Sequence, residues 1–209
     1  QRYLTRVQRV PAIEVASFAD QMLQALEYTH AQGVVHRDLK PANIYVCPGT
    51  DGQPFFKLLD FGISKHVLSD GAEPGAALTA PDVPLAGDDL EDEAERLHIT
   101  GEGQILGTPE YMAPEQITGG KIDARSDVYA LGVLLYRLAT GRLPFEATTR
   151  VEMYRGHLFE APPPIDPALG LPADLVTVIL RALVKQPNDR WASAAAMLQA
   201  VIAARTKLV

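Results

Sequence analysis

The sequence has one cysteine, no long apolar run and no excess of positive charge. Cys47 alone cannot form an internal disulfide, which fits a reducing compartment, and we interpret it as a small apolar residue. The formal net charge of −7 argues against a nucleic-acid-binding surface. The best candidate for a membrane span, residues 128–138, is too short and contains Arg137. We therefore expect a cytoplasmic segment, whether or not the whole protein is anchored in a membrane.

The chain also lacks an initiator methionine and a secretory signal. It begins at Gln1 and soon enters helix-like sequence, which suggests a cut within a longer protein. Its 209 residues, 47% hydrophobic and 22% charged, are enough for one globular domain with a sizeable core.

Hydrophobic spacing predicts a mainly helical fold. Apolar residues recur every three or four positions over 11–32, which indicates an amphipathic helix. Apolar runs at 44–46 and 55–59 flank the turn-forming residues 48–52 and predict a small β-hairpin. Further helices are expected over 126–140, with Gly141 as its stop, and over 148–156, 172–184 and 193–204. The expected fold is thus α-helical with one or two small hairpins.

Residues 66–99 differ from the rest in composition. They are rich in Gly, Pro, Ala and acidic side chains, and they predict a long acidic loop, with a short helix over 90–97 as an alternative for part of it. A solvated insertion is the simplest interpretation. Residues 66–99 could also hold the segment that follows them away from its active position, or dock a basic partner, and both alternatives stay open.

Three short motifs carry the chemistry. The first, residues 36–43, contains His36-Arg37-Asp38 and ends in Asn43; the second is Asp60-Phe61-Gly62, after a strand-like run; the third is residues 113–115, Ala-Pro-Glu. Each is weak alone, but three in this order and context are specific. With them the chain resembles the eukaryotic-like serine/threonine protein kinases, including those of bacteria. The resemblance implies that 1–209 is the C-terminal lobe of a catalytic domain, with 66–99 inserted in its activation segment.

The resemblance also assigns catalytic roles. Phosphoryl transfer depends on positioning and charge neutralisation. Asp38 would orient the attacking hydroxyl and accept its proton, and Lys40 would place positive charge near the transferred group. Asn43 and Asp60 would hold Mg²⁺, or Mn²⁺ as an alternative, through their oxygens. Thr108, in the segment 107–111, would bond to Asp38 and Lys40 and favour Ser/Thr over Tyr substrates.

Other positions take structural roles by the same resemblance: His36, Phe61, Gly62, Glu115, Asp127 and Arg190. Glu115 would form a buried ion pair with Arg190. Asp127 would brace the backbone around His36 and Arg37, and His36 would stack on Phe61 as a packing residue.

Regulation is expected in the activation segment. Arg37 resembles an arginine that binds a phosphate there, and Thr100 lies where bacterial members carry a phosphorylated threonine. Glu102 would supply part of that negative charge permanently. The alternative is that Thr100 only lies in a loop without such a role.

The sequence departs from the family in what surrounds the nucleotide. It has no glycine-rich loop, no strand lysine with its glutamate partner, and no adenine hinge, so the N-terminal β lobe that makes a full kinase α+β is absent. Tyr45 falls where an aliphatic residue usually lies under adenine, and it could stack on the base or crowd it. We expect little ATP binding or turnover from the 209 residues alone.

The predicted function is that of a serine/threonine kinase that uses ATP and Mg²⁺ to phosphorylate proteins, including itself. Its partners would be protein substrates and the missing N-terminal lobe. One alternative is a pseudokinase-like interaction module, favoured by the missing lobe, Tyr45 and the insertion. A small-molecule phosphotransferase is a second, against which residues 108–110 and 113–115 argue, because these segments serve a peptide-binding face.

Overall fold

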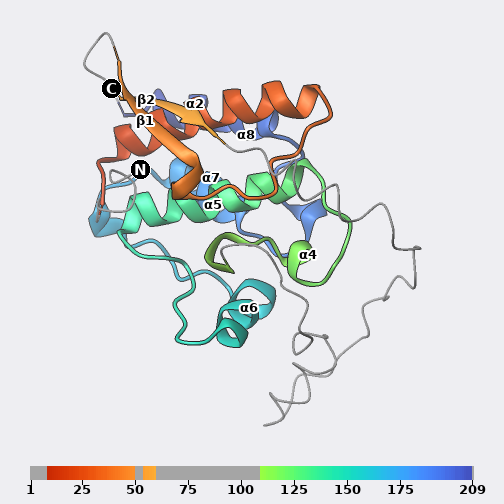
Figure 1. Ribbon diagram of the computed structural model, residues 1–209. Helices are drawn as coiled ribbons and strands as arrows, with labels where there is room; N and C mark the ends of the chain where they lie inside the picture. The colour runs from red at the N-terminus through yellow and green to blue at the C-terminus, as the bar shows by residue number, and fades with distance from the viewer. Residues whose placement is uncertain (1–8, 50–53, 60–108, 209) are drawn as a thin grey trace.

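The fold consists mainly of α-helices with one small sheet (Figure 1). The computed structural model describes residues 9–49, 54–59 and 109–208. The α-helices are α2 Ala12–Ala31, α4 Pro114–Ile117, α5 Ala124–Thr140, α6 Arg150–Phe159, α7 Ala173–Ala182 and α8 Ala194–Arg205. The strands are β1 Ile44–Pro48 and β2 Pro54–Leu58, and 3₁₀ turns span Pro41–Asn43, Pro109–Tyr111, Pro167–Leu169 and Pro187–Asp189. The predicted mainly helical fold is confirmed for these residues.

The predicted hairpin is present, and it lies on α2. Strands β1 and β2 pair antiparallel, with Ile44 opposite Leu58. Gln21 of α2 fastens the second strand, because its Nε2 donates to the Pro54 carbonyl and its Oε1 accepts from the Phe56 amide. The Phe56 ring meets Phe18 edge-on, with 4.9 Å between ring centroids. The inner side of the hairpin is therefore part of the core.

Helix α5 is the central element, as its apolar sequence predicts. It is buried over most of its length and contacts α2 on one side and α7 on another. The Asp123 carboxylate accepts the Arg125 amide at its start, and Gly141 ends it in a left-handed conformation with φ 83°. At Gly132 a Cβ would lie 2.8 Å from the Cβ of Ala182. A glycine is therefore required for α5 and α7 to approach this closely.

Helix boundaries agree with the sequence prediction except at α6. Helices α2, α7 and α8 start and end within two residues of the predicted limits. Helix α6 was placed too early, at 148–156, because its start is fixed by Thr149 and Glu152, which cap each other's backbone amides. It continues to Phe159. The short helix α4 was not predicted, since four residues carry no periodic signal.

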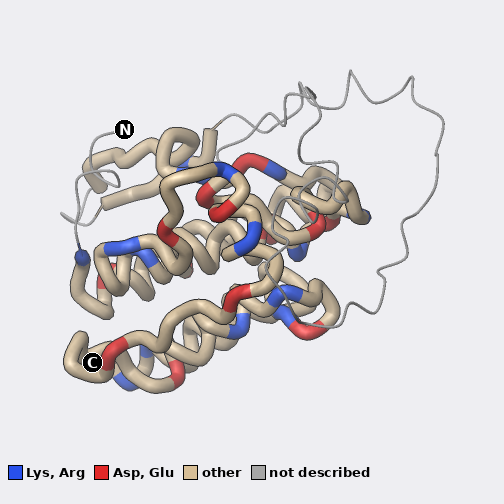
Figure 2. The backbone as a smooth tube through the Cα atoms, turned by 90° about the horizontal axis from the view of Figure 1, so that it is seen from below, with Lys and Arg blue, Asp and Glu red and all other residues tan. Residues whose placement is uncertain are grey.

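The first and last helices pack side by side. Helix α2 has its most extensive contacts with α8 (Figure 1), and an exposed bond between Arg205 and Asp20 joins them at 3.1 Å. Basic and acidic residues are interspersed along the backbone tube in Figure 2. Within the described ranges, no helix combines the length and apolar character needed to cross a bilayer.

Candidate active site

The loop between α2 and β1 brings together three of the predicted catalytic residues. Lys40 Nζ lies 2.9 Å from Asp38 Oδ2, and both side chains are about one-fifth exposed, at 22% and 21%. Asn43 Nδ2 donates to the Asp38 carbonyl at 2.8 Å and to its Oδ2 at 3.3 Å. The turn Pro41–Asn43, closed by the Asn43 amide on the Lys40 carbonyl, sets this spacing. An amine, a carboxylate and an amide thus meet at one accessible point.

This cluster can bind a polar substrate group and a cation. A carboxylate beside a lysine can orient a hydroxyl and accept its proton, while the ammonium attracts an anionic group. The two bonds to Asp38 use the nitrogen of the Asn43 amide, which leaves its oxygen for another partner such as a hard cation. Asn43 therefore fits the predicted magnesium role. Among the described residues no group of three His, Cys, Asp or Glu side chains could hold a metal ion alone.

The backbone before Asp38 adopts a costly conformation. Arg37 has φ 65°, the only positive φ of a non-glycine residue within the described ranges. A non-glycine residue pays for the left-handed region with steric strain and needs support from its surroundings. Part of this support comes from Asp127 in helix α5.

Asp127 supplies the bracing that the sequence predicts. Its side chain is 1% exposed, and its two oxygens accept the main-chain amides of His36 and Arg37, both at 2.8 Å. His30 at the end of α2 donates to the same carboxylate through Nε2, also at 2.8 Å. Sequence reasoning missed His30, because nothing in its neighbourhood signals a contact 97 residues away.

His36 is buried and fully engaged, which favours a packing role. Its Nε2 donates to the Leu59 carbonyl at 2.9 Å, and its Nδ1 accepts the Asp38 amide at 3.3 Å. This pattern requires a neutral ring with the proton on Nε2. His36 thus ties the catalytic loop to the strand end that leads to Asp60. The stacking partner predicted for it, Phe61, lies outside the described residues, as does Gly62.

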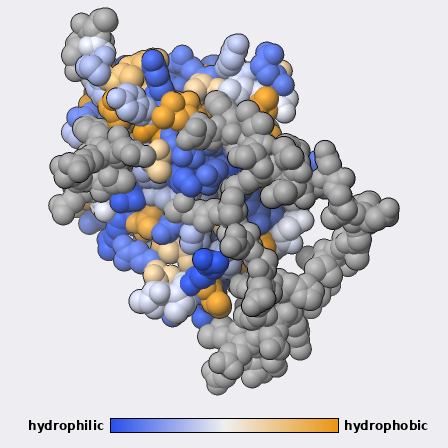
Figure 3. All heavy atoms as spheres, in the orientation of Figure 1, coloured by the Kyte–Doolittle hydropathy of each residue, from blue (hydrophilic) through white to orange (hydrophobic). Residues whose placement is uncertain are grey.

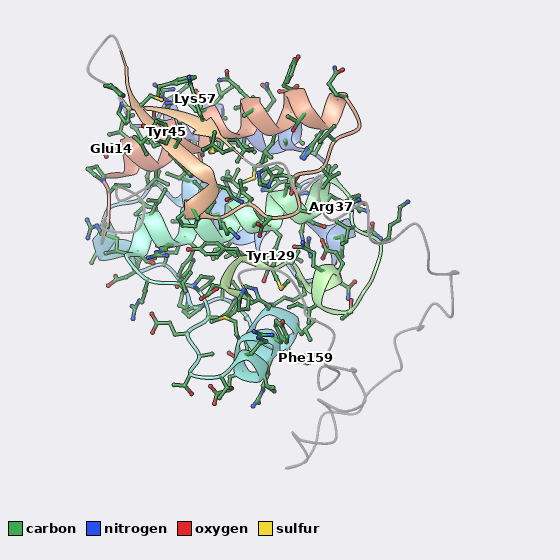
Figure 4. All side chains as sticks on the ribbon, viewed as in Figure 1. Glu14, Arg37, Tyr45, Lys57, Tyr129 and Phe159 are labelled. Atoms are coloured by element: carbon green, nitrogen blue, oxygen red, sulfur yellow. The ribbon has the colours of Figure 1, made fainter. Side chains whose placement is uncertain are left out.

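Tyr45 lies on the outer side of the hairpin. Its side chain is 52% exposed and stands opposite Lys57, while Phe55, 49% exposed, stands opposite Cys47. Figure 4 shows Tyr45 and Lys57 on the hairpin, at a distance from Arg37. Figure 3 shows hydrophobic atoms at the surface over this part of the molecule. The hairpin therefore presents an aromatic face to solvent.

Glu115 and Arg190 form the expected buried ion pair. Two bonds of 2.8 and 2.7 Å join them, and Ser126 Oγ donates to the same carboxylate at 2.6 Å. Burial acts to raise the pKa of Glu115, but the hydrogen bonds from Arg190 and Ser126 outweigh it and hold that pKa below its ordinary value. Arg190 also donates to three main-chain carbonyls, those of Val184, Lys185 and Arg125.

A second polar cluster, built around the buried His157, lies between α5 and α6, and sequence analysis did not predict it. Tyr129 Oη and His157 Nδ1 share a hydrogen bond of 2.9 Å, and the Phe145 ring meets the imidazole edge-on. Lys185 Nζ donates to the Gly156 carbonyl at 2.7 Å and lies 4.0 Å from the Phe145 ring centre. Burial lowers the pKa of His157 to about 3 and that of Lys185 to about 7.

The remaining predicted residues lie outside the described residues, and their roles stay predictions. They are Asp60, Phe61, Gly62, Thr100, Glu102, Thr108 and the insertion 66–99. For Arg37, the predicted phosphate ligand, Nε is buried and has no hydrogen-bond partner among the described residues.

Comparison with known proteins identifies the family. The protein kinase domain model matches residues 1–202. The chain is 42% identical over 200 residues to serine/threonine-protein kinase pkn3 of Myxococcus xanthus, covering 93% of this chain and 32% of that protein. It is 43% identical over 190 residues to Pkn1 of the same organism, covering 90% of this chain and 23% of that protein.

A mycobacterial relative gives the same result. Serine/threonine-protein kinase PknB of Mycobacterium tuberculosis is 36% identical over 187 residues, covering 89% of this chain and 25% of that protein. The chain thus spans only between about a fifth and a third of the length of the curated relatives it matches. By sequence, by fold and by its Asp38–Lys40–Asn43 cluster, the chain belongs to the protein kinase domain family, as a bacterial, eukaryotic-like serine/threonine kinase domain.

Proposed function

We propose that the protein carrying this chain transfers the γ-phosphate of ATP to Ser or Thr hydroxyls of proteins, including its own. The observation that supports the proposal is the cluster of Asp38, Lys40 and Asn43 on a loop that Asp127 braces. These three residues supply the base, the cation and the metal-facing amide that phosphoryl transfer needs from this lobe.

The chemistry begins with positioning of the substrate hydroxyl. Asp38 accepts a hydrogen bond from that hydroxyl and takes its proton as the phosphorus–oxygen bond forms. Lys40 Nζ lies 2.9 Å from the Asp38 carboxylate. From there its positive charge would stabilise the negative charge of the phosphoryl group during transfer. Thr108 would complete this pocket by bonding to Asp38 and Lys40, which suits an aliphatic alcohol better than a phenol.

Asn43 and Asp60 would hold Mg²⁺, with Mn²⁺ as an alternative. When bound, the metal neutralises charge on the ATP phosphates. The chain itself fixes the orientation of the Asn43 amide. Asp38 accepts hydrogen bonds from the amide nitrogen, which leaves the amide oxygen for the metal. Tyr45 on the hairpin would form the floor under adenine, where its exposed ring can stack on the base.

The chain alone supplies half of a nucleotide site. The glycine-rich loop, the strand lysine and its glutamate partner have no counterpart in these 209 residues. Turnover is therefore assigned to the native protein, with an N-terminal lobe over the aromatic face of the hairpin. Its substrates would be proteins with accessible Ser or Thr residues. This lobe would lie on the cytoplasmic side of the membrane if the native protein is anchored in one.

Regulation is proposed for the activation segment, with the insertion 66–99 within it. A phosphate on Thr100, supplemented by the fixed charge of Glu102, would be met by Arg37. The buried Arg37 Nε without a partner among the described residues supports this assignment, since a guanidinium in such a place needs an acceptor.

The test is phosphoryl transfer by the native protein with Mg²⁺ and labelled ATP. Wild type should label Ser or Thr residues, and Asp38→Asn should be silent while folded. Asp174→Asn, on the exposed surface, is the matched control and should keep full activity. Label at Thr100 would support its regulatory role.

The same assay decides between the proposal and its alternatives. A folded wild type that transfers no phosphate would overturn the kinase and leave a pseudokinase-like interaction module, for which the exposed Tyr45 and Phe55 offer a contact surface. Transfer to small molecules but not to proteins would indicate a small-molecule phosphotransferase.

A further inference from the structure

Gln116 is the second support of the strained turn at Arg37. Its Nε2 donates to the Arg37 carbonyl at 2.8 Å, across 79 residues of sequence. The other end of the same amide, Oε1, accepts the Ala113 amide at 3.0 Å, at the start of α4. One side chain therefore joins the catalytic loop to the segment 109–113, which follows Thr108.

The two supports act on opposite ends of one residue. Asp127 holds the Arg37 N–H, and Gln116 holds the Arg37 C=O. With φ 65°, Arg37 has a conformation that relaxes unless its surroundings hold it. The Arg37 carbonyl belongs to the peptide unit that leads into Asp38, so a rotation of that unit would displace the carboxylate.

The charge at residue 116 matters because only one end of its side chain faces the catalytic loop. A neutral amide can donate to the Arg37 carbonyl and accept from Ala113 at once. A carboxylate at the same place keeps the bond to Ala113 and opposes the carbonyl of Arg37 with a second acceptor. The capping of α4 and the contact with the catalytic loop can therefore be separated by a single substitution.

We propose that Gln116 is a positioning residue that couples the segment 109–113 to the catalytic loop and holds the peptide unit before Asp38 in its working orientation. The proposal rests on the kinase function proposed above. It predicts that loss of the Gln116–Arg37 bond lowers kcat and leaves the KM for ATP unchanged, because Asp38 acts on the hydroxyl and not on nucleotide binding.

The experiment compares three variants of the native protein. Gln116→Glu keeps the length and the α4 cap but loses the donor, Gln116→Met loses both bonds, and Thr118→Val removes only a bond within the end of α4. We expect kcat to fall by roughly 10- to 100-fold in Gln116→Glu and Gln116→Met, as for a small displacement of a catalytic group. Thr118→Val should match wild type.

A pH profile separates positioning from simple stability. When the carboxyl of Gln116→Glu takes a proton it regains a donor. The ratio of its kcat to that of wild type should therefore rise as the pH is lowered from 8 toward 5, while the ratio for Gln116→Met should stay flat. Gln116→Glu with wild-type kcat throughout would overturn the proposal and leave Gln116 as a cap of α4.

Amide hydrogen exchange tests the bond between Gln116 and Arg37 without relying on kinase activity. Peptides covering residues 34–40 should exchange faster in both Gln116 variants than in wild type and in Thr118→Val. If wild type transfers no phosphate, the proposed function fails, and this exchange still reports on the brace. Unchanged exchange in Gln116→Met would overturn the coupling whatever the activity.

Discussion

The buried Arg190 and the partly buried Lys185 are two cations close in sequence, and they differ in how many hydrogen-bond acceptors surround them. Arg190 donates to both oxygens of Glu115 and to three main-chain carbonyls, and its side chain is fully buried. Lys185 has the Gly156 carbonyl and the Phe145 ring, and burial lowers its pKa to about 7. An arginine stays charged on burial and therefore needs an acceptor for each of its donors, whereas a lysine with few acceptors can lose its proton instead.

The comparison is tested most severely by removing Arg190. Arg190→Met leaves the Glu115 carboxylate buried without its partner and should lower the free energy of unfolding by roughly 3–5 kcal/mol. Urea denaturation followed by circular dichroism measures this. A loss below about 1 kcal/mol would mean that the pair is solvated in solution.

The second test removes both charges. Glu115→Leu added to Arg190→Met should recover about 2 kcal/mol of the loss, because no charge is then stranded in the core. Recovery stays incomplete, since the carbonyls of Val184, Lys185 and Arg125 keep no donor. A double variant that is less stable than either single one would show that the pair is needed for more than mutual neutralisation.

Helix positions and the catalytic loop were predictable, and the reasons are local. Apolar spacing marks α2 and α7, and Gly141 marks the end of α5, because these signals act within a few residues. The catalytic cluster of Asp38, Lys40 and Asn43 was expected because residues 36–43 match a motif of the kinase family. The pairing of Glu115 with Arg190 followed from family resemblance alone.

What could not be predicted depends on contacts between distant elements. His30 reaches Asp127, Gln116 reaches Arg37, and Tyr129 reaches His157 only after the helices have packed. No motif or regular spacing in the sequence connects the two residues of any of these pairs. Their roles come from the tertiary structure, which sequence periodicity does not encode.

The third test follows the pH dependence of Lys185. Its pKa is about 7 in the folded state and about 10.4 in an unfolded chain, so the unfolded state holds the extra proton between these values. Its contribution to stability should therefore rise as the pH increases from about 7 to 10. Lys185→Met should remove this rise, measured as urea midpoints across that range. Lys57→Met, at an exposed position, should keep it.

The smallest effect is expected at the exposed pair of Arg205 and Asp20. Arg205→Ala removes a bond of 3.1 Å in which the arginine side chain is 44% exposed. Water and salt screen such a pair, so the loss should be about 0–1 kcal/mol. Thermal unfolding at low and high salt measures it. A loss of stability as large as that in Arg190→Met would contradict the view that a buried ion pair matters more to stability than an exposed one.

The pairing of α2 with α8 has a consequence for how the chain is made. The partners Asp20 and Arg205 are 185 residues apart, and a ribosome adds roughly 5–20 residues per second. Roughly 10–40 s therefore pass between the synthesis of α2 and that of α8. During this time the apolar side of α2 that packs against α8 is uncovered. We expect a chaperone, or a domain of the same protein that is synthesised earlier, to cover this apolar surface in the meantime.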